Sequence, residues 1–198
     1  MRYVCDYGAG TYAVNVPDLK VSQYFGLFPS LMSVQYLPYY STIDDPVMIE
    51  IANQLSSQLE GRSERVKATV VLAFVQQNIN YVSDEAQYGK RDMWALPIMT
   101  LYSCKGDCDC MASLYVSIAH NMGLDVATVQ ITGHMFPAVC FEGGHGQSYK
   151  LGDKNYYHME VTDSLTVAGR FWRRGEKFET IAKPIIPTTQ FRNILKNG

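Results

Sequence analysis

Apolar residues recur with helical spacing between residues 45 and 123, and short segments rich in Val, Tyr and Phe follow from residue 125 to residue 162. Helical patterns come first and strand-like patterns afterwards, without the βαβ alternation that builds a parallel sheet. This order predicts an α+β fold in which helices pack on an antiparallel sheet. The chain has 198 residues, of which 47% are hydrophobic, so it is long enough to bury a core, and we expect one domain.

Two helices are expected before the cysteine-rich stretch. The first has Asp45 as its N-cap and Pro46 in its first turn, and Gly61 ends it. The second runs from Ser63 to about Tyr81 and carries one apolar stripe.

A third, buried helix is expected to begin at or just after Cys108 and to close at Gly123. Its apolar residues recur at spacings of three and four: Met111, Leu114, Tyr115, Ile118 and Met122. Glycine-rich turns then separate short strands, which we interpret as an antiparallel meander. These expected strands cover residues 125–132, 135–141, 148–151 and 156–162.

Charge and composition exclude some classes of partner. The formal net charge is -2 and no basic cluster exceeds the short stretch 170–174, so we expect no nucleic acid partner. No run of about 18 apolar residues and no basic leader followed by an apolar run is present, so we expect no membrane partner. The odd number of cysteines, with Cys104, Cys108 and Cys110 crowded together, favours a reducing compartment, and we expect a cytoplasmic protein.

Cys108 is the candidate nucleophile. A thiol attacks only as thiolate, and a free pKa of about 8.5 leaves little thiolate at neutral pH. At the N-terminus of a helix, unpaired amides and the helix dipole stabilise an anion by on the order of 1 kcal/mol. The same amides could bind the oxyanion of a tetrahedral intermediate.

His134 is the candidate base. It lies at the junction of two expected strands, where its ring can emerge from a sheet edge toward a helix end. His120 belongs to the helix of Cys108 and cannot fold back to the thiol. His145 lies in a glycine-rich loop, and His158 alternates with its neighbours along an expected strand.

A carboxylate is needed to orient the imidazole and to stabilise its cation. Glu160 and Asp163 both close the last expected strand. We favour Glu160, because an unpaired acid inside an apolar strand would be costly, whereas Asp163 is suited to cap the following turn.

The stretch from Gly106 to Leu114, followed by residues 123–126, resembles the nucleophile signature of prokaryotic transglutaminase-like cysteine peptidases. Other family motifs are similar to segments 74–81, 94–101, 133–135 and 156–162. The resemblance covers roughly residues 66 to 165 and departs at Cys110, where the family has an acid.

This resemblance implies a papain-like core in which the nucleophile helix packs on an antiparallel sheet. It also implies a thiol mechanism without a cofactor, in which Cys108 attacks a carbonyl, His134 transfers the proton and Glu160 orients His134. The acyl-enzyme then passes to water or to an amine. Candidates for the oxyanion hole precede the nucleophile: Gln77, Tyr81 and Trp94.

Residues 1–198 are then expected to form a single transglutaminase-like domain. Residues 1–44 would be an extended N-terminal wing, residues 45–165 the catalytic core, and residues 166–198 an extension. We expect the tail from Trp172 onward to be irregular and to lie on the surface.

The favoured function is a cysteine peptidase or amidase acting on a protein or peptide substrate. Two alternatives stay open: a protein-glutamine acyltransferase or deamidase with the same triad, and a catalytically silent protein-binding domain. No feature of the sequence specifies an oligomeric state.

A structural metal held by the three clustered cysteines and His134 is disfavoured. Their C-x3-C-x-C spacing differs from that of zinc knuckles and of iron–sulfur runs. A disulfide from Cys108 to Cys104 or to Cys110 would be strained inside a helix start.

Overall fold

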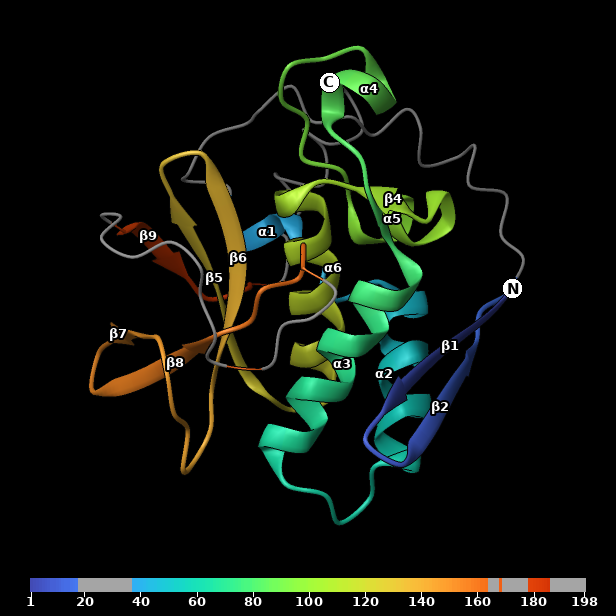
Figure 1. Ribbon diagram of the computed structural model, residues 1–198, viewed down its shortest axis with the longest axis vertical. Coiled ribbons are helices and arrows are strands. Elements are labelled where there is room, and N and C mark those ends of the chain that lie inside the picture. The colour runs from blue at the N-terminus through green and yellow to red at the C-terminus, as the bar shows by residue number, and fades with distance from the viewer. Residues whose placement is uncertain (18–36, 164–167, 169–177, 186–198) are drawn as a thin grey trace.

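The computed structural model describes residues 1–17, 37–163, 168 and 178–185 and shows helices packed on an antiparallel sheet (Figure 1). The five-stranded sheet has the order β7-β8-β6-β5-β9. Its strands are β5 (Asp125–Ile131), β6 (His134–Cys140), β7 (Ser148–Leu151), β8 (Lys154–His158) and β9 (Phe178–Ala182). The predicted α+β class is therefore confirmed.

The central element is α6 (Cys108–Asn121), whose start at Cys108 agrees with the prediction. It packs against β5 and β6 on one side and against three helices on the other. Leu114, Tyr115 and Ile118 are completely buried there, as their helical spacing predicted. The three helices are α2 (Pro46–Gln58), α3 (Glu64–Asn78) and α5 (Pro97–Ser103).

The starts of α2 and α3 also agree with the prediction. The Asp45 side chain accepts a hydrogen bond from the Val47 amide at 2.8 Å, and Ser63 accepts one from the Val66 amide at 3.4 Å. These side chains satisfy amides that have no partner within the helix. No helix in the described ranges has the length and apolar character to cross a bilayer.

The predicted end of the second helix at Tyr81 is wrong. The helix stops at Asn78, and the extended Ile79 leads into β3 (Asn80–Tyr81). This strand pairs in parallel with β4 (Lys105–Gly106), just before α6. The backbone therefore leaves the helix to make hydrogen bonds with a segment distant in sequence. The short helices α1 (Leu37–Tyr40) and α4 (Asp84–Tyr88) complete the described helices.

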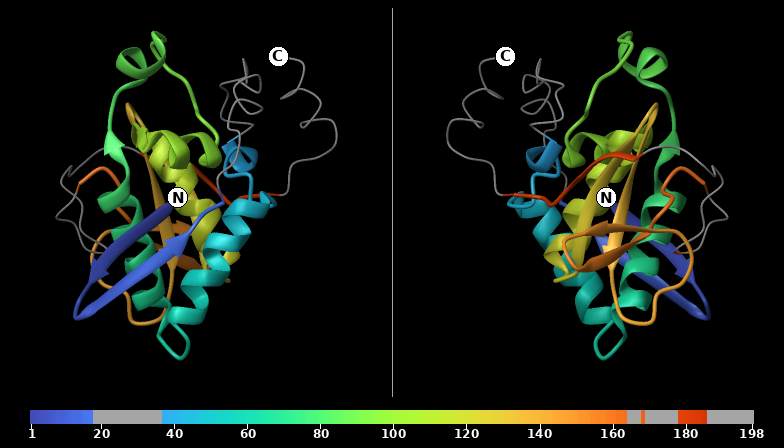
Figure 2. Two further views of the ribbon diagram at one scale, coloured as in Figure 1. Left: turned by 90° about the vertical axis from the view of Figure 1, so that its right-hand side faces the viewer. Right: turned by 90° about the vertical axis from the view of Figure 1, so that its left-hand side faces the viewer.

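The described part of the predicted N-terminal wing contains a hairpin and the helix α1, so the wing is not extended throughout. Strands β1 (Arg2–Tyr7) and β2 (Gly10–Asn15) pair along their whole length and bury Cys5 and Val14 against the helices. The hairpin and the large sheet lie on opposite sides of the helices (Figure 1 and Figure 2). Residues 18–36 of the predicted wing lie outside the described residues. The division into wing, core and extension stays a prediction.

The predicted meander is wrong in its strand order. β6 pairs with β8 rather than with β7, which lies at the edge of the sheet. β8 also ends at His158, so Glu160 follows the strand instead of lying inside it. The expectation of an irregular tail is wrong at residues 178–182, because β9 pairs with β5. Most of the tail lies outside the described residues.

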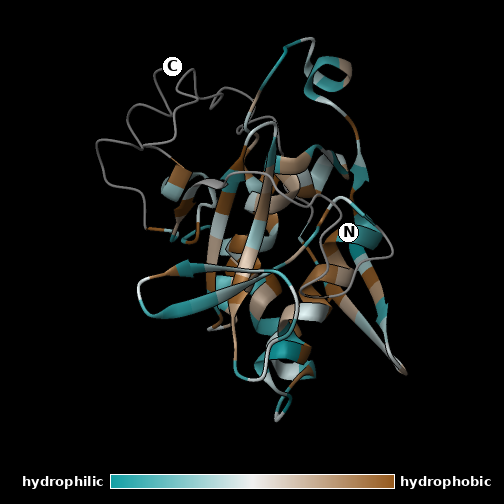
Figure 3. Ribbon diagram, turned by 60° about the vertical axis from the view of Figure 1, so that its left-hand side comes forward, coloured by the Kyte–Doolittle hydropathy of each residue, from teal (hydrophilic) through white to brown (hydrophobic). Residues whose placement is uncertain are grey.

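The sheet buries apolar side chains on both faces. Val126, Met135 and Val139 belong to the main core with the helices, whereas Phe136 and Ala138 belong to a smaller cluster. Figure 3 shows the corresponding concentration of hydrophobic residues in α6 and the central strands, with the β7–β8 hairpin more hydrophilic. The alternation along β6 thus places Phe136 and Ala138 on the face away from α6.

Candidate active site

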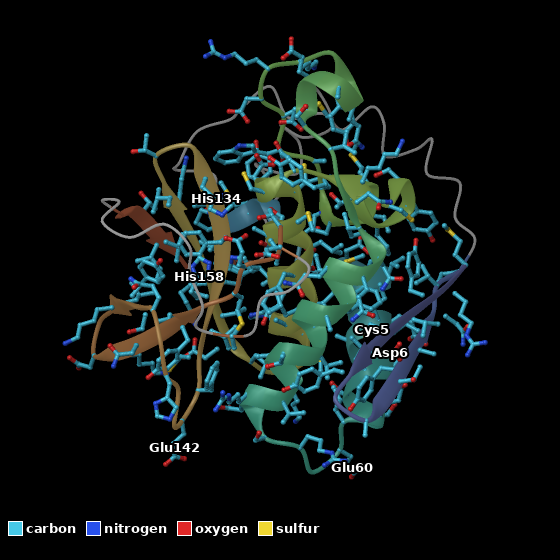
Figure 4. All side chains as sticks on the ribbon, viewed as in Figure 1. Cys5, Asp6, Glu60, His134, Glu142 and His158 are labelled. Carbon is cyan, nitrogen blue, oxygen red and sulfur yellow. The ribbon has the colours of Figure 1, made fainter. Side chains whose placement is uncertain are left out.

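A cavity of about 480 Å³ opens where the N-terminal end of α6 faces the start of β6. Cys108, the first residue of α6, and His134, the first residue of β6, both line it. In Figure 4, His134 lies near the N-terminal end of α6, and His158 lies further along the sheet. The fold thus brings together two residues that the sequence analysis selected separately.

The thiol of Cys108 is not activated by its position alone. Burial, followed by the carboxylates of Asp109 and Asp107, raises the pKa of Cys108 to about 12, although hydrogen bonds from the Met135 and Asp109 amides lower it. The sequence analysis expected the helix terminus to favour the thiolate, but desolvation and the two acids outweigh it. Nucleophilic attack by Cys108 therefore requires a base that takes its proton.

His134 contacts the carboxylate of Glu160. Its Nε2 atom lies 2.9 Å from Oε2 of Glu160, and their side chains are 13% and 7% exposed. Burial alone would raise the pKa of Glu160, but hydrogen bonds from His134, His158 and Thr162 lower it well below its usual range. The carboxylate is thus ionised and only accepts hydrogen bonds, so Nε2 of His134 carries a proton. This assignment leaves Nδ1 as the nitrogen that can serve a thiol.

The second oxygen of Glu160 is fixed by Thr162. Oε1 accepts hydrogen bonds from the Thr162 amide at 3.1 Å and from its hydroxyl at 2.6 Å. The carboxylate therefore has partners on both oxygens and a defined orientation. Asp163, the alternative acid, contributes its backbone carbonyl oxygen to the Gln76 side chain.

Gln76 was missed by the sequence analysis. Its Nε2 atom donates to the carbonyl oxygen of Glu160 at 2.7 Å and also to that of Asp163. The segment after β8 is thereby attached to α3. The adjacent Gln77 was selected instead, and a helical-wheel comparison of the two glutamines would have distinguished their faces.

Of the oxyanion-hole candidates, Gln77 does not reach the cavity. Its side chain makes two hydrogen bonds of 2.9 Å with the backbone of Asp6 in the hairpin. Successive helix residues point about 100° apart, so Gln77 faces away from its neighbour Gln76. Tyr81 and Trp94 do line the cavity, with Tyr81 57% exposed and Trp94 buried.

An acidic cluster adjoins Cys108. Asp84, Asp107 and Asp109 each have a buried Oδ1 atom that accepts no hydrogen bond from a donor in the described part of the chain. Burial, and then Asp107, raises the pKa of Asp84 to about 7, although the Met93 amide, which donates to it at 2.5 Å, lowers it. Burial, and then Asp107 and Asp84, raises the pKa of Asp109 well above its usual range. Protons or a cation must offset this crowding of carboxylates.

The three clustered cysteines and His134 do not form the metal site that the sequence analysis disfavoured. In the described part of the chain, three groups have ligand atoms within 4.8 Å of one another: Asp84, Asp107 and Cys110; Asp107, Cys108 and Asp109; and Asp84, Asp92 and Asp109. Neither Cys104 nor His134 belongs to such a group. The five cysteines are all free thiols, so neither disulfide considered from the sequence forms.

No protein-family model and no curated protein matches this sequence. Solved structures are similar in fold. Calcium-bound LapG of Legionella pneumophila has a TM-score of 0.49 and 14% identity, over 73% of this chain and 86% of that chain. EGTA-treated LapG from the same organism also has a TM-score of 0.49 and 14% identity, over 85% and 98% of the two chains.

A third neighbour is a putative cysteine protease from Cytophaga hutchinsonii, with a TM-score of 0.45 and 14% identity. The match covers 83% of this chain and 55% of that one.

Proposed function

We propose that this protein is a thiol hydrolase that cleaves peptide or amide bonds through an acyl-enzyme. Cys108 is the nucleophile, His134 the base and Glu160 the acid that orients His134. The observation that carries the proposal is the 2.9 Å contact between His134 and Glu160 beside the cavity that also holds Cys108. An imidazole–carboxylate pair whose imidazole lines the same cavity as a thiol supplies the base and the orienting acid of thiol hydrolysis.

The reaction follows from the proton positions. Nδ1 of His134 takes the thiol proton as Cys108 Sγ attacks the carbonyl carbon, and Glu160 stabilises the imidazolium that forms. The tetrahedral intermediate collapses when the C–N bond breaks, and His134 gives the proton to the leaving amine. A water molecule, deprotonated by His134, then attacks the thioester, and the acid product leaves as Cys108 recovers its proton.

The raised pKa of Cys108 agrees with this sequence of steps. With its pKa near 12, the resting thiol is neutral, so proton transfer accompanies attack instead of preceding it. The oxyanion would accept a hydrogen bond from the Tyr81 hydroxyl or from the Trp94 indole N–H, since both side chains line the cavity.

The experiment that tests the proposal compares wild type with Cys108→Ala and Cys104→Ala. Each is incubated with a fluorogenic peptide library containing glutamine, together with a labelled primary amine. We expect backbone cleavage or side-chain amide hydrolysis in wild type and Cys104→Ala only. An amine adduct formed without hydrolysis would favour the acyltransferase alternative. No turnover, together with a Cys108 that iodoacetamide does not label, would overturn the enzymatic proposal in favour of a binding domain.

We further propose that the carboxylates of Asp84, Asp107 and Asp109 hold a divalent cation. Each has a buried oxygen that receives no hydrogen bond from the described residues, and carboxylate oxygens are the ligands that Ca²⁺ prefers. Cys110 does not suit a hard cation, because its buried thiol donates to the Met93 carbonyl oxygen at 3.6 Å. A bound cation would supply positive charge against the acids that raise the pKa of Cys108.

Calorimetric titration of the EDTA-treated protein with CaCl2 and with MgCl2 tests the cation proposal independently of activity. We expect saturable binding and a higher midpoint of thermal unfolding with one of the ions. Asp153→Asn, which changes an exposed acid in the β7–β8 turn, is the control and should retain binding. Equal heats for wild type and Asp109→Asn would contradict the proposal.

A further inference from the structure

A second imidazole contacts the oxygen of Glu160 that faces His134. Nε2 of His158 lies 3.3 Å from Oε2 of Glu160, the atom that His134 contacts at 2.9 Å. His158 is completely buried, so water does not compete for this contact. Sequence reasoning left His158 without a role, and the proposed proton transfers do not use it.

The proton on His158 is assigned by its two partners. Because the Glu160 carboxylate only accepts hydrogen bonds, Nε2 of His158 carries the proton. Nδ1 of His158 is then an acceptor, and the Tyr149 hydroxyl lies 3.4 Å from it. Hydrogen bonds thus run in one direction, from Tyr149 to His158 and from His158 to Glu160.

His158 is held as a neutral group. Burial lowers its pKa, although Glu160 opposes this effect, and the nearby His134 lowers the pKa further. Glu160 and Tyr149 contact it, and the imidazole of His134 lies close enough to act on its charge. A neutral N–H donor satisfies a buried carboxylate without adding a positive charge beside the base.

An apolar ring fixes the geometry of these groups. The buried Phe136 ring lies with its centroid 4.0 Å from that of His158, 5.7 Å from that of His134 and 5.2 Å from that of Tyr149. The three polar rings therefore surround one phenyl group. Rotation of His158 away from Glu160 would displace this packing.

We propose that His158 is a positioning residue. It orients the Glu160 carboxylate and shares its negative charge. The carboxylate then does not hold an extra proton on His134 before the reaction begins, and His134 can accept the thiol proton. The inference rests on the proposed function, because it assigns His158 to the same proton-transfer site. His158 does not line the cavity and is not expected to touch substrate.

The test compares two substitutions of similar length, His158→Gln and His158→Met. The glutamine amide can place a donor where Nε2 of histidine lies, whereas methionine has no donor. Loss of the donor leaves the Glu160 charge facing His134 alone, which stabilises the imidazolium. We therefore expect the pKa of His134 to rise by on the order of one unit in His158→Met and to remain close to the wild-type value in His158→Gln.

The measurements are ¹⁵N NMR titration of the histidine rings and the pH profile of Cys108 alkylation, and neither depends on turnover. In wild type, the His158 ring should keep its proton on Nε2 from pH 5 to pH 8. If His158 titrates in this range, or if the pKa of His134 is the same in all three proteins, the inference is wrong. If the pKa of His134 shifts as expected but the protein hydrolyses no substrate, the hydrolase proposal is wrong and the positioning role of His158 stands.

Tyr149→Phe keeps the inference testable if His158→Met does not fold. Removing the hydroxyl that donates to Nδ1 should make protonation of His158 easier, so its ring should begin to titrate at higher pH than in wild type. An unchanged tautomer and an unchanged titration would contradict the proposed direction of the hydrogen bonds.

Discussion

The side chain of Gln76 in α3 donates a hydrogen bond of 2.7 Å to the backbone carbonyl oxygen of Glu160. It also contacts the carbonyl oxygen of Asp163, so one amide group attaches the segment after β8 to the helical layer. This segment carries the carboxylate that meets His134. The position of the acid therefore depends on a residue 84 positions earlier in the chain.

Gln76→Ala should destabilise the protein by about 1–3 kcal/mol, because two partly buried carbonyl oxygens lose this donor. It should also slow alkylation of Cys108 at pH 7, since Glu160 loses its support. Gln77→Ala is the matched control and should affect only the attachment of the hairpin. Urea unfolding and iodoacetamide kinetics check the two effects. Equal alkylation rates in Gln76→Ala and wild type would show that Gln76 does not support the position of Glu160.

Glu160→Gln should lower the rate of hydrolysis by on the order of 10² to 10⁴, because a neutral amide neither fixes the tautomer of His134 nor stabilises its cation. Asp163→Asn should retain most of the activity. Steady-state rates on a peptide cleaved by the wild type check this prediction. The opposite ranking of the two variants would identify Asp163 as the acid.

The lowered pKa of Glu160 predicts acid sensitivity. A carboxyl group whose pKa is depressed in the folded state stabilises the fold above its unfolded pKa of about 4.3, and this stabilisation is lost as the pH falls below that value. Wild type should therefore be more stable than Glu160→Gln at pH 7, and the difference should shrink toward pH 3. Urea unfolding at a series of pH values measures it. A constant difference across this range would contradict the assignment.

Asp84 should have the opposite effect. Its pKa is raised to about 7, so its destabilising contribution is absent below the unfolded pKa of about 3.9 and is complete above pH 7. Asp84→Asn keeps an acceptor for the Met93 amide and removes the charge. In EDTA at pH 7.5, we expect its thermal midpoint to rise by about 2–4 °C, the equivalent of about 1 kcal/mol. Scanning calorimetry checks this, and the variant should no longer gain stability from CaCl2.

Local patterns predicted the helices well. The caps at Asp45 and Ser63 and the start of α6 at Cys108 involve hydrogen bonds within a few residues, so composition and spacing identify them. The pairing of His134 with Glu160 was also expected, because a catalytic imidazole needs a carboxylate and an unpaired acid in an apolar segment would be costly.

Long-range contacts produced the differences. The exchange of β7 and β8, the addition of β9 to the edge at β5, and the use of Gln76 rather than Gln77 all depend on which distant segment supplies a hydrogen-bond partner. The raised pKa of Cys108 could not be predicted from local sequence either, since it comes from burial and from acids that the fold brings close to the thiol.

Residue types and periodicity thus determined the elements and the candidate nucleophile, base and acid, because helix caps and apolar periods act over a few residues. Strand order, the second imidazole on Glu160 and the acidic cluster beside Cys108 were decided by tertiary packing. Burial strengthens electrostatic interactions and leaves a polar group only the partners that the fold brings to it, and neither effect is written in local spacing.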